Sequence, residues 1–347
     1  MNRESLVTLP AALTAPGIDG GARFVMGVDG GATKTLAAVL DLREHTLHLG
    51  HGGSSNPDAV GAAAATASLL KATDEALGRA GIDRDGLDAA VLAIAGTDTE
   101  GVAEHVREVR PASWIVVNDV VGAWAAATGG EPGVGAISGT GSNVFGVGPH
   151  ARAWRAGGWG HILGDEGSGY RLAVESIRAA LADRERSGPE TGLSAAAVDF
   201  FGVDSVEQLA TLVYSKPLMK GEIAAFAVET ARVAHAGDAV ARALYDHAAA
   251  QLGAQVTAVI EQTGLTGEFP VGLIGSAFKA GALFVEPLTE VVRRVSPEAR
   301  VGVVEMAPVG GCLLLAARVG GGESSIDSAT LKGLLDAVLA REGVFRE

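Results

Sequence analysis

A carboxylate and two glycines interrupt the first apolar segment of the chain. The apolar run 24–28 stops at Asp29, the pair Gly30-Gly31 follows, and a second apolar run begins after Thr35. Two strands joined by a tight turn fit this pattern better than a helix does. Glycines let backbone N–H groups approach a ligand closely, and successive N–H groups in a turn form an anion-binding nest. An acid beside such a nest suits a magnesium-bound polyphosphate, so the turn is predicted to hold the tail of ATP.

The side chains of this turn have separate predicted roles. Asp29 is expected to act on Mg²⁺ through coordinated waters, because Mg²⁺ dehydrates reluctantly. An ordinary glycine-rich hairpin with a solvated Lys34 is the alternative, since short glycine motifs produce many false matches. No glycine directly precedes Lys34, so the turn is not a P-loop. The predicted phosphate-binding residues are Gly30, Gly31, Thr33, Lys34 and Thr35.

A second glycine turn lies between the apolar runs 134–138 and 143–147, which again predicts a hairpin. It is expected to cradle the β-phosphate region of the nucleotide from the opposite side, and a plain hairpin turn is the alternative. The predicted residues are Gly139, Thr140, Gly141 and Ser142.

Asp119 is the candidate catalytic base. It follows the apolar run 114–117, and a carboxylate at the carboxyl end of a buried strand can reach into a cleft. Transfer of phosphate to an alcohol needs an acceptor for the alcohol proton. The alternative is that Asp119 only caps a helix that begins at Val120.

The elements that would position these residues occur in the same order twice. Three strands, then helix, strand, helix, strand and helix, are predicted in 23–129 and again in 130–322. The second copy carries extra helices at about 185–263. A terminal helix over 327–344 is expected to pack back on the first copy, and residues 1–22 form an N-terminal extension. Two similar α/β halves would thus face each other across a cleft with one phosphate turn on each wall.

Composition excludes several classes of protein. The chain has 347 residues and a formal net charge of −14, which argues against nucleic acid or an anionic membrane as the main partner. Its one cysteine, Cys312, excludes a disulfide framework and a Cys-rich metal site. Neither a signal peptide nor an apolar stretch long enough to span a membrane is recognisable. We therefore expect a cytoplasmic protein, and a homodimer.

The motifs carry a resemblance to a known superfamily. The turns 29–35 and 138–143 resemble the two phosphate motifs of the actin-like superfamily, which contains sugar kinases and heat-shock-type ATPases. The loop Gly157–Ser168 resembles that of N-acetylglucosamine kinases and their bacterial BadF/BadG-type relatives. The likeness covers about residues 24 to 320. It implies an α/β fold of two duplicated actin-like (ribonuclease H-like) domains around a central cleft.

The resemblance also implies roles for particular residues. The aspartate that matches Asp119 is the base in the resembled kinases. In animal relatives His-Trp follows the matching asparagine, where this chain has Pro57-Asp58, so recognition of an acetyl group stays open. Trp159 could instead be a core wedge, and His161 is expected to be a hydrogen-bonded loop residue. The predicted sugar-binding residues are Asn56, Asp119, Asn143, Trp159, Gly160 and Asp165.

The resemblance indicates one more segment, and the sequence itself draws attention to two lysines. Gly275 and Ser276 come directly after a predicted strand, where the superfamily has its adenosine motif, although an ordinary strand-to-helix connection explains them almost as well. Lys216 and Lys220 flank a proline in the extra helices and are expected to be solvated surface charges.

The leading functional hypothesis is an ATP- and Mg²⁺-dependent kinase that phosphorylates the 6-hydroxyl of N-acetylglucosamine or glucosamine. N-acetylmuramic acid and other hexoses stay open as substrates. The main alternative is a BadF-type ATPase that activates a partner protein, which the single cysteine disfavours. A nucleotide-binding regulator without catalysis is disfavoured by the presence of both Asp29 and Asp119, and a zinc-dependent sugar kinase by the missing Cys-rich motif.

Overall fold

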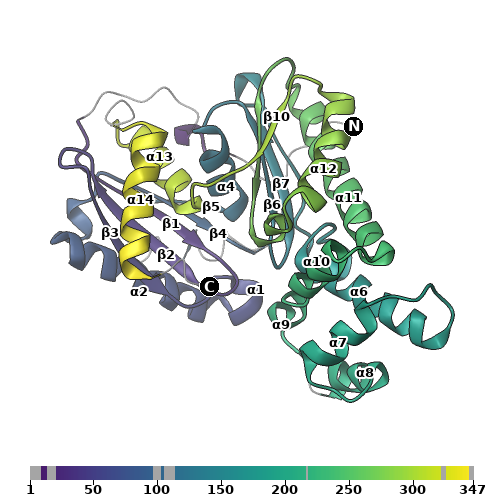
Figure 1. Ribbon diagram of the computed structural model, residues 1–347. Coiled ribbons are helices and arrows are strands. Elements are labelled where there is room, and N and C mark those ends of the chain that lie inside the picture. Colours follow the sequence, from purple (N-terminus) through teal and green to yellow (C-terminus); the bar gives the residue numbers. More distant parts are fainter. Residues whose placement is uncertain are drawn as a thin grey trace.

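The computed structural model describes residues 9–13, 21–96, 103–104, 114–215, 218–321 and 326–343. They form two mixed five-stranded sheets with helices around them (Figure 1). The first sheet has the order β3-β2-β1-β4-β5, and the second has the order β8-β7-β6-β9-β10. The strands of the first sheet are β1 (Phe24–Gly30), β2 (Thr35–Asp41), β3 (Thr46–Gly52), β4 (Ala89–Ile94) and β5 (Trp114–Asn118). Those of the second are β6 (Gly133–Ser138), β7 (Ser142–Val147), β8 (Ala153–Gly157), β9 (Pro270–Ile274) and β10 (Arg300–Val303).

The equal strand order confirms the predicted α/β fold with duplicated halves. In each sheet the first strand of the half pairs antiparallel with the second and parallel with the fourth. The register Gly30↔Thr35 leaves a four-residue turn between β1 and β2, and Ser138↔Ser142 leaves a three-residue turn between β6 and β7. Both predicted hairpins are therefore present.

The helices of the first half are α1 (Pro57–Val60), α2 (Ala62–Ala80) and α4 (Asp119–Thr128). From the sequence, Asp58 could cap one Ala-rich helix that runs to about Ala80, but the structure has two helices here and a different cap. The side chain of Asn56 caps α1 by accepting a hydrogen bond from the Asp58 N–H at 2.8 Å, and Gly61 then separates α1 from α2 at φ 79°. A residue with a side chain is strained at this φ, so a glycine occupies the position that separates the two helices. The sequence also predicts a helix around 99–109, and most of that range lies outside the described residues.

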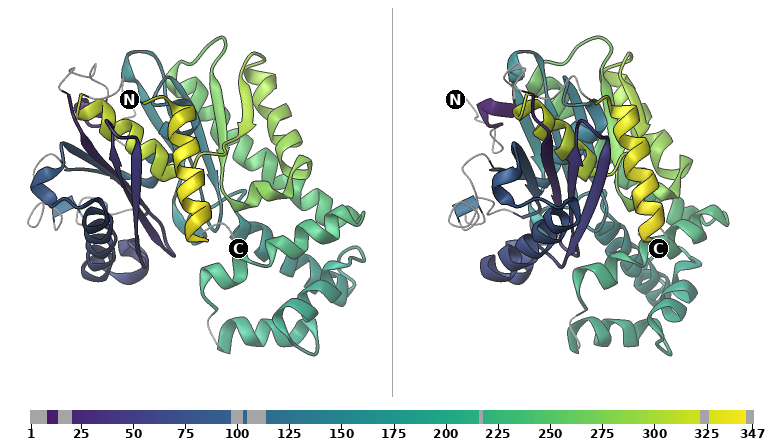
Figure 2. Two further views of the ribbon diagram at one scale, coloured as in Figure 1. Left: turned by 60° about the vertical axis from the view of Figure 1, so that its left-hand side comes forward. Right: turned by 90° about the vertical axis from the view of Figure 1, so that its left-hand side faces the viewer.

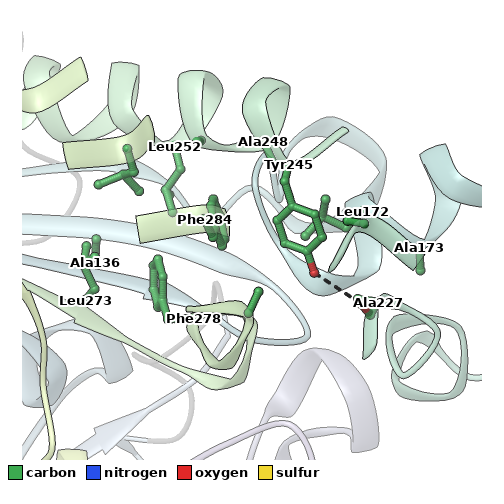
Figure 3. Packing of buried hydrophobic residues seen from close by; sticks show 14 of the residues in the cluster. Ala136, Leu172, Ala173, Ala227, Tyr245, Ala248, Leu252, Leu273, Phe278 and Phe284 are labelled. Carbon is green, nitrogen blue, oxygen red and sulfur yellow. Dashed lines mark hydrogen bonds between the residues drawn. The ribbon is translucent and has the colours of Figure 1, made fainter. Parts of the chain in front are cut away.

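The second half carries more helices. They are α5 (Gly160–Leu163), α6 (Gly169–Glu185), α7 (Leu193–Phe201), α8 (Val206–Ser215), α9 (Lys220–Ala224), α10 (Ala227–His235), α11 (Ala239–Thr263), α12 (Ala282–Val295) and α13 (Pro308–Val319). Figure 2 shows α6 to α10 gathered at one end of the second sheet. Tyr245 on α11 ties this helical region to the sheet core, because its buried ring packs on Phe284 and its hydroxyl donates to the Ala227 carbonyl at 3.2 Å (Figure 3).

Two helices cross between the sheets, and each packs on the sheet of the other half. Helix α4 follows β5 but packs on β6 and β9, whereas α13 follows β10 but packs on β1 and β4. The two helices touch where glycines allow it, since a Cβ on Gly311 would lie 2.1 Å from the Gly122 carbonyl oxygen. This exchange of helices joins the two halves into one packed unit.

Both ends of the described chain return to the first half. Helix α14 (Ser328–Glu342) lies beside β3 and α13, and Glu342 pairs with His51 and Arg79 at 2.6 Å each. Leu13 is fully buried with residues of α13, so this part of the N-terminal extension belongs to the core. None of the helices in the described ranges has both the length and the apolar character needed to cross a membrane.

Candidate active site

A cavity of about 500 Å³ lies between the two sheets, and both glycine turns line it. From the first half it is lined by the turn after β1, by Asn56 and by the start of α4. From the second half it is lined by the turn after β6 and by the loop after β8. The predicted site residues on its wall are Asp29, Gly31, Thr33, Lys34, Asn56, Asp119, Gly139, Thr140, Gly141, Ser142, Asn143, Trp159, Gly160 and Asp165. The structure thus brings together residues that are far apart in the sequence.

The first turn is closed by a hydrogen bond from the Gly31 N–H to the Lys34 carbonyl at 2.9 Å. Two of its predicted phosphate-binding residues have structural contacts instead of a place on the cavity wall. Gly30 is buried against Ser55, and the buried Thr35 hydroxyl donates to the Gly53 carbonyl at 2.7 Å. These contacts hold β1, β2 and the segment after β3 together beneath the turn.

The second turn is bound to the loop that precedes α6. Ser138 and Ser142 donate their hydroxyl hydrogens to the carbonyls of Gly167 and Glu166, each at 2.7 Å. The Gly169 N–H donates to the Gly139 carbonyl at 2.8 Å. The turn is therefore fixed in place before a ligand arrives, which is the preorganisation that phosphoryl transfer depends on.

Asp119 lies at the first position of α4, and the cap of that helix is another residue. Asn118 is the N-cap, since its side-chain oxygen accepts from the Val120 N–H at 3.3 Å. Burial raises the pKa of Asp119 to about 6, against the opposing effects of backbone N–H groups at the helix start and of the Arg155 guanidinium. A carboxylate with this pKa accepts a proton more readily than an ordinary aspartate does.

Asp29 is the second perturbed carboxyl group of the cavity. Burial at the end of β1 and the nearby charge of Asp119 raise its pKa to about 7, although Lys34 opposes this. A buried carboxylate whose pKa is raised by a second carboxylate lies where a cation is favourable. The donor set is therefore compatible with a divalent cation that accompanies a polyphosphate.

The raised pKa of Asp29 predicts a pH-dependent effect on stability. Because the folded-state pKa of Asp29 lies above the unfolded value, protonation of this group stabilises the folded state. That contribution to stability is lost as pH rises through about 7. We expect Asp29→Asn to raise the free energy of unfolding by about 2 kcal/mol at pH 8, after allowance for solvent screening, and by much less at pH 5.

Thermal unfolding at the two pH values, without Mg²⁺ and nucleotide, measures this effect. Asp199→Asn on the exposed side of α7 is the matched control and should change little at either pH. An equal gain for Asp29→Asn at both pH values would contradict the assignment of the raised pKa to Asp29.

Two asparagines connect the halves at the floor of the cavity. The Asn143 amide N–H donates to the Asn118 side-chain oxygen at 3.3 Å, and Asn118 donates to the Gly96 carbonyl at 3.0 Å. The Asn143 side-chain oxygen is buried and has no hydrogen-bond partner among the described residues. An unpaired buried acceptor is costly, so Asn143 is suited to accept a hydrogen bond from a ligand hydroxyl.

Trp159 lies at the rim of the cavity and is 52% exposed, so it is not a core wedge. The Arg155 guanidinium lies over its ring, 5.4 Å from the centroid, and the buried Arg155 Nε lacks a hydrogen-bond partner among the described residues. His161 on the same loop packs edge-on against Tyr170. The described part of the chain contains no group of three or more His, Cys, Asp or Glu that could hold a metal ion.

Asp165 is held by protein partners. Its carboxylate accepts from the Ser142 N–H at 3.0 Å and from the Lys220 ammonium at 2.6 Å. Lys220 lines the cavity, so the expectation that it is a solvated surface charge is wrong. The helical region brings it back to the turn, a contact that sequence spacing does not reveal. Lys216 lies outside the described residues.

A second cavity of about 380 Å³ shares Gly139 and Thr140 with the first. Its wall is largely made of small apolar residues of α9 and α10, together with Tyr245, Ser276 and Lys279. Gly275 follows the end of β9, precedes Ser276 and is exposed. Phe278 in the same segment is a core residue, and its ring stacks on Phe284. The two cavities meet at the second turn, as expected for a ligand with a flat apolar part and a polyphosphate tail.

Asn118, Arg155 and Lys220 are polar residues at the site that were not predicted as site residues. Asn118 directly precedes Asp119 and could have been found as a polar residue at a strand end. Arg155 lies two residues before the Gly157-Gly158 pair, but its side chain is brought to the site only by the pairing of β8 with β7. Lys220 had no local signal, because its partner Asp165 is 55 positions away.

Two curated relatives of the chain are named as amino-sugar kinases. The chain is 33% identical over 244 residues to the N-acetylmuramic acid/N-acetylglucosamine kinase of Clostridium acetobutylicum, covering 69% of this chain and 80% of the relative. It is 27% identical over 311 residues to the N-acetyl-D-glucosamine kinase of Dictyostelium discoideum, covering 84% and 97%. A solved structure from Chromobacterium violaceum, provisionally named an N-acetylglucosamine kinase, matches 85% of this chain and 99% of its own with a TM-score of 0.71 and 25% identity.

A family model spans nearly the whole two-sheet unit. It matches residues 26–316, from β1 to the last turns of α13, and so includes both glycine turns, Asp119 and the crossing helices. On this match, the chain belongs to the BadF/BadG/BcrA/BcrD ATPase family.

Proposed function

We propose that the protein is an ATP-dependent kinase that phosphorylates a hydroxyl group of an amino sugar. The observation that carries this proposal is the single cavity that holds Asp119 together with both glycine turns. Transfer of phosphate to an alcohol needs a group that accepts the hydroxyl proton, and Asp119 lines the same cavity as both turns. The names of the two curated relatives support the choice of an amino sugar as the acceptor.

In the proposed reaction the sugar oxygen attacks the γ-phosphorus of ATP. The new oxygen–phosphorus bond forms while the bond between the γ-phosphorus and the bridging oxygen to the β-phosphate breaks, so that ADP leaves. Asp119 accepts the proton of the sugar hydroxyl. The turns after β1 and β6 would bind the phosphates through backbone N–H groups and through the side chains of Thr33, Lys34 and Thr140, whereas Ser142 already donates its hydroxyl and its N–H within the protein. This chemistry depends on position and charge more than on covalent catalysis.

Asp29 would hold Mg²⁺ through water, because its carboxylate lies at the cavity, where burial and the charge of Asp119 raise its pKa. When bound, the ion neutralises phosphate charge during transfer.

The acceptor position is proposed as the 6-hydroxyl of N-acetylglucosamine or glucosamine. Asn56, Asn143, Trp159 and Gly160 line the cavity and would bind the sugar ring. Asp165 would contribute one carboxylate oxygen while it keeps its two protein partners. N-acetylmuramic acid is a further acceptor to test, since the Clostridium relative is named for it.

A coupled ADP-release assay over a panel of sugars tests the proposal. The panel contains N-acetylglucosamine, glucosamine, N-acetylmuramic acid, N-acetylmannosamine and glucose, with a no-sugar control. We expect ADP release to require an amino sugar, and NMR of the product to place the phosphate on oxygen 6. Equal ADP release with and without sugar would reject the kinase assignment.

The alternative, an ATPase that activates a partner protein, finds no support at Cys312. Its thiol is fully buried in α13 and donates to the Val28 carbonyl at 3.2 Å, and burial raises its pKa. A buried thiol is a poor ligand for a cluster shared between subunits.

We also propose that the kinase acts as a cytoplasmic homodimer. Light scattering after size-exclusion chromatography should give about twice the chain mass of 35.0 kDa, and a monomer mass would reject the dimer.

A further inference from the structure

Lys220 reaches the second glycine turn from a part of the chain that belongs to neither hairpin. It is the first residue of α9, within the helical region between β8 and β9. Its side chain lines the cavity between the sheets, whereas Gly221, Ala224 and Ala225 just after it line the second cavity. The start of α9 therefore lies where the two cavities meet.

The ammonium of Lys220 lies against the turn itself. Its Nζ is 2.6 Å from one carboxylate oxygen of Asp165, and the other oxygen of Asp165 accepts from the Ser142 N–H. A Cβ placed on Gly141 would lie 3.1 Å from the Lys220 Nζ and 2.8 Å from Asp165. The positive charge is thus held at the surface of the nest that would receive a phosphate.

The cavity needs positive charge on this side. Asp29, Asp58, Asp119 and Asp165 all lie on its wall, and among the described lining residues the lysines are Lys34 and Lys220, one from each half. An ammonium has three N–H donors, and within the described residues Lys220 uses one of them, in its hydrogen bond to Asp165. Two donors are then available to a ligand.

We propose that Lys220 binds the polyphosphate tail of ATP and ADP, with Asp165 holding its ammonium beside the second turn. This inference rests on the proposed kinase function and adds to it a phosphate-binding residue from the helical region. Lys34 then contacts the tail from the first half and Lys220 from the second. Because α9 also lines the second cavity, this short helix contacts both the polyphosphate tail and the flat apolar part of the nucleotide in the proposed arrangement.

Nucleotide binding measured by calorimetry tests the inference without relying on turnover. With Mg²⁺ present, Lys220→Met should weaken binding of ATP and ADP by about 10- to 100-fold, as expected for loss of a charged hydrogen bond, and leave adenosine binding unchanged. Lys220→Arg should recover much of the affinity. Lys71→Met, on the exposed side of α2, is the matched control and should bind as the wild type does.

Sugar binding separates this role from a purely structural one. If Lys220 only positions Asp165, Lys220→Met will weaken the sugar and leave ADP unaffected, and the inference is overturned. Lys220→Gln can still hydrogen-bond to Asp165 but carries no charge. It therefore distinguishes phosphate binding by Lys220 from positioning of Asp165, even if Lys220→Met does not fold. If the wild type itself binds neither ATP nor ADP, the kinase proposal fails instead.

Discussion

Asp119→Asn is expected to lower kcat for sugar phosphorylation by about 10²- to 10⁴-fold, the usual contribution of a positioned general base. Asparagine has nearly the same shape but cannot accept the proton of the sugar hydroxyl. ATP affinity should change little, because in the proposed arrangement the glycine turns and not Asp119 bind the phosphates. Initial rates with saturating sugar give kcat, and a separate binding measurement gives the affinity for ATP.

The pH profile provides a second readout for Asp119. The base works only when it is deprotonated, so wild-type kcat should fall as pH drops through about 6, the pKa that burial gives this carboxyl group. Asp85→Asn on the exposed 3-10 turn Arg84–Gly86 is the control and should keep the wild-type rate and profile. A residual rate above one tenth of wild type in Asp119→Asn would contradict its role as the base.

Gly311→Ala is expected to lower the free energy of unfolding by about 3 kcal/mol through overpacking where α13 crosses α4. The new Cβ would lie 2.1 Å from the Gly122 carbonyl oxygen and 2.4 Å from the Ala126 nitrogen, and both are backbone atoms of a helix. The helices must move apart, and the two sheets that they hold must move with them. Scanning calorimetry should show a melting temperature lower by about 5 °C.

Gly333→Ala is the matched control, because Gly333 is also in a helix but a Cβ there meets nothing within 4 Å. That change should leave stability equal or higher by about 0.5 to 1 kcal/mol, since alanine favours helix more than glycine does. If both variants have the same stability, the close crossing of α4 and α13 does not hold the halves together.

Much of the fold could be predicted from the sequence because its signals are local. Apolar runs that end at Asp29, Ser138 and Asn118 mark strand ends, and short turns rich in glycine fix the two hairpins. The repeated order of elements then specifies two like sheets, since the same local pattern folds in the same way twice. The positions of Asp119 and of both turns at one cleft follow from that duplication, because corresponding strand ends lie at the same edge of each sheet.

The sequence by itself therefore determined the strands, the hairpins, the duplication and the placement of Asp29 and Asp119 at strand ends. Only the tertiary structure decided which helix covers which sheet, and which polar groups pair across the cavity. Asn118 meets Asn143, Asp165 meets Lys220, and Gly311 meets Gly122. The physical reason is that each of these contacts joins segments 25 or more positions apart, so it depends on how whole elements pack and leaves no periodic pattern in the neighbouring residues.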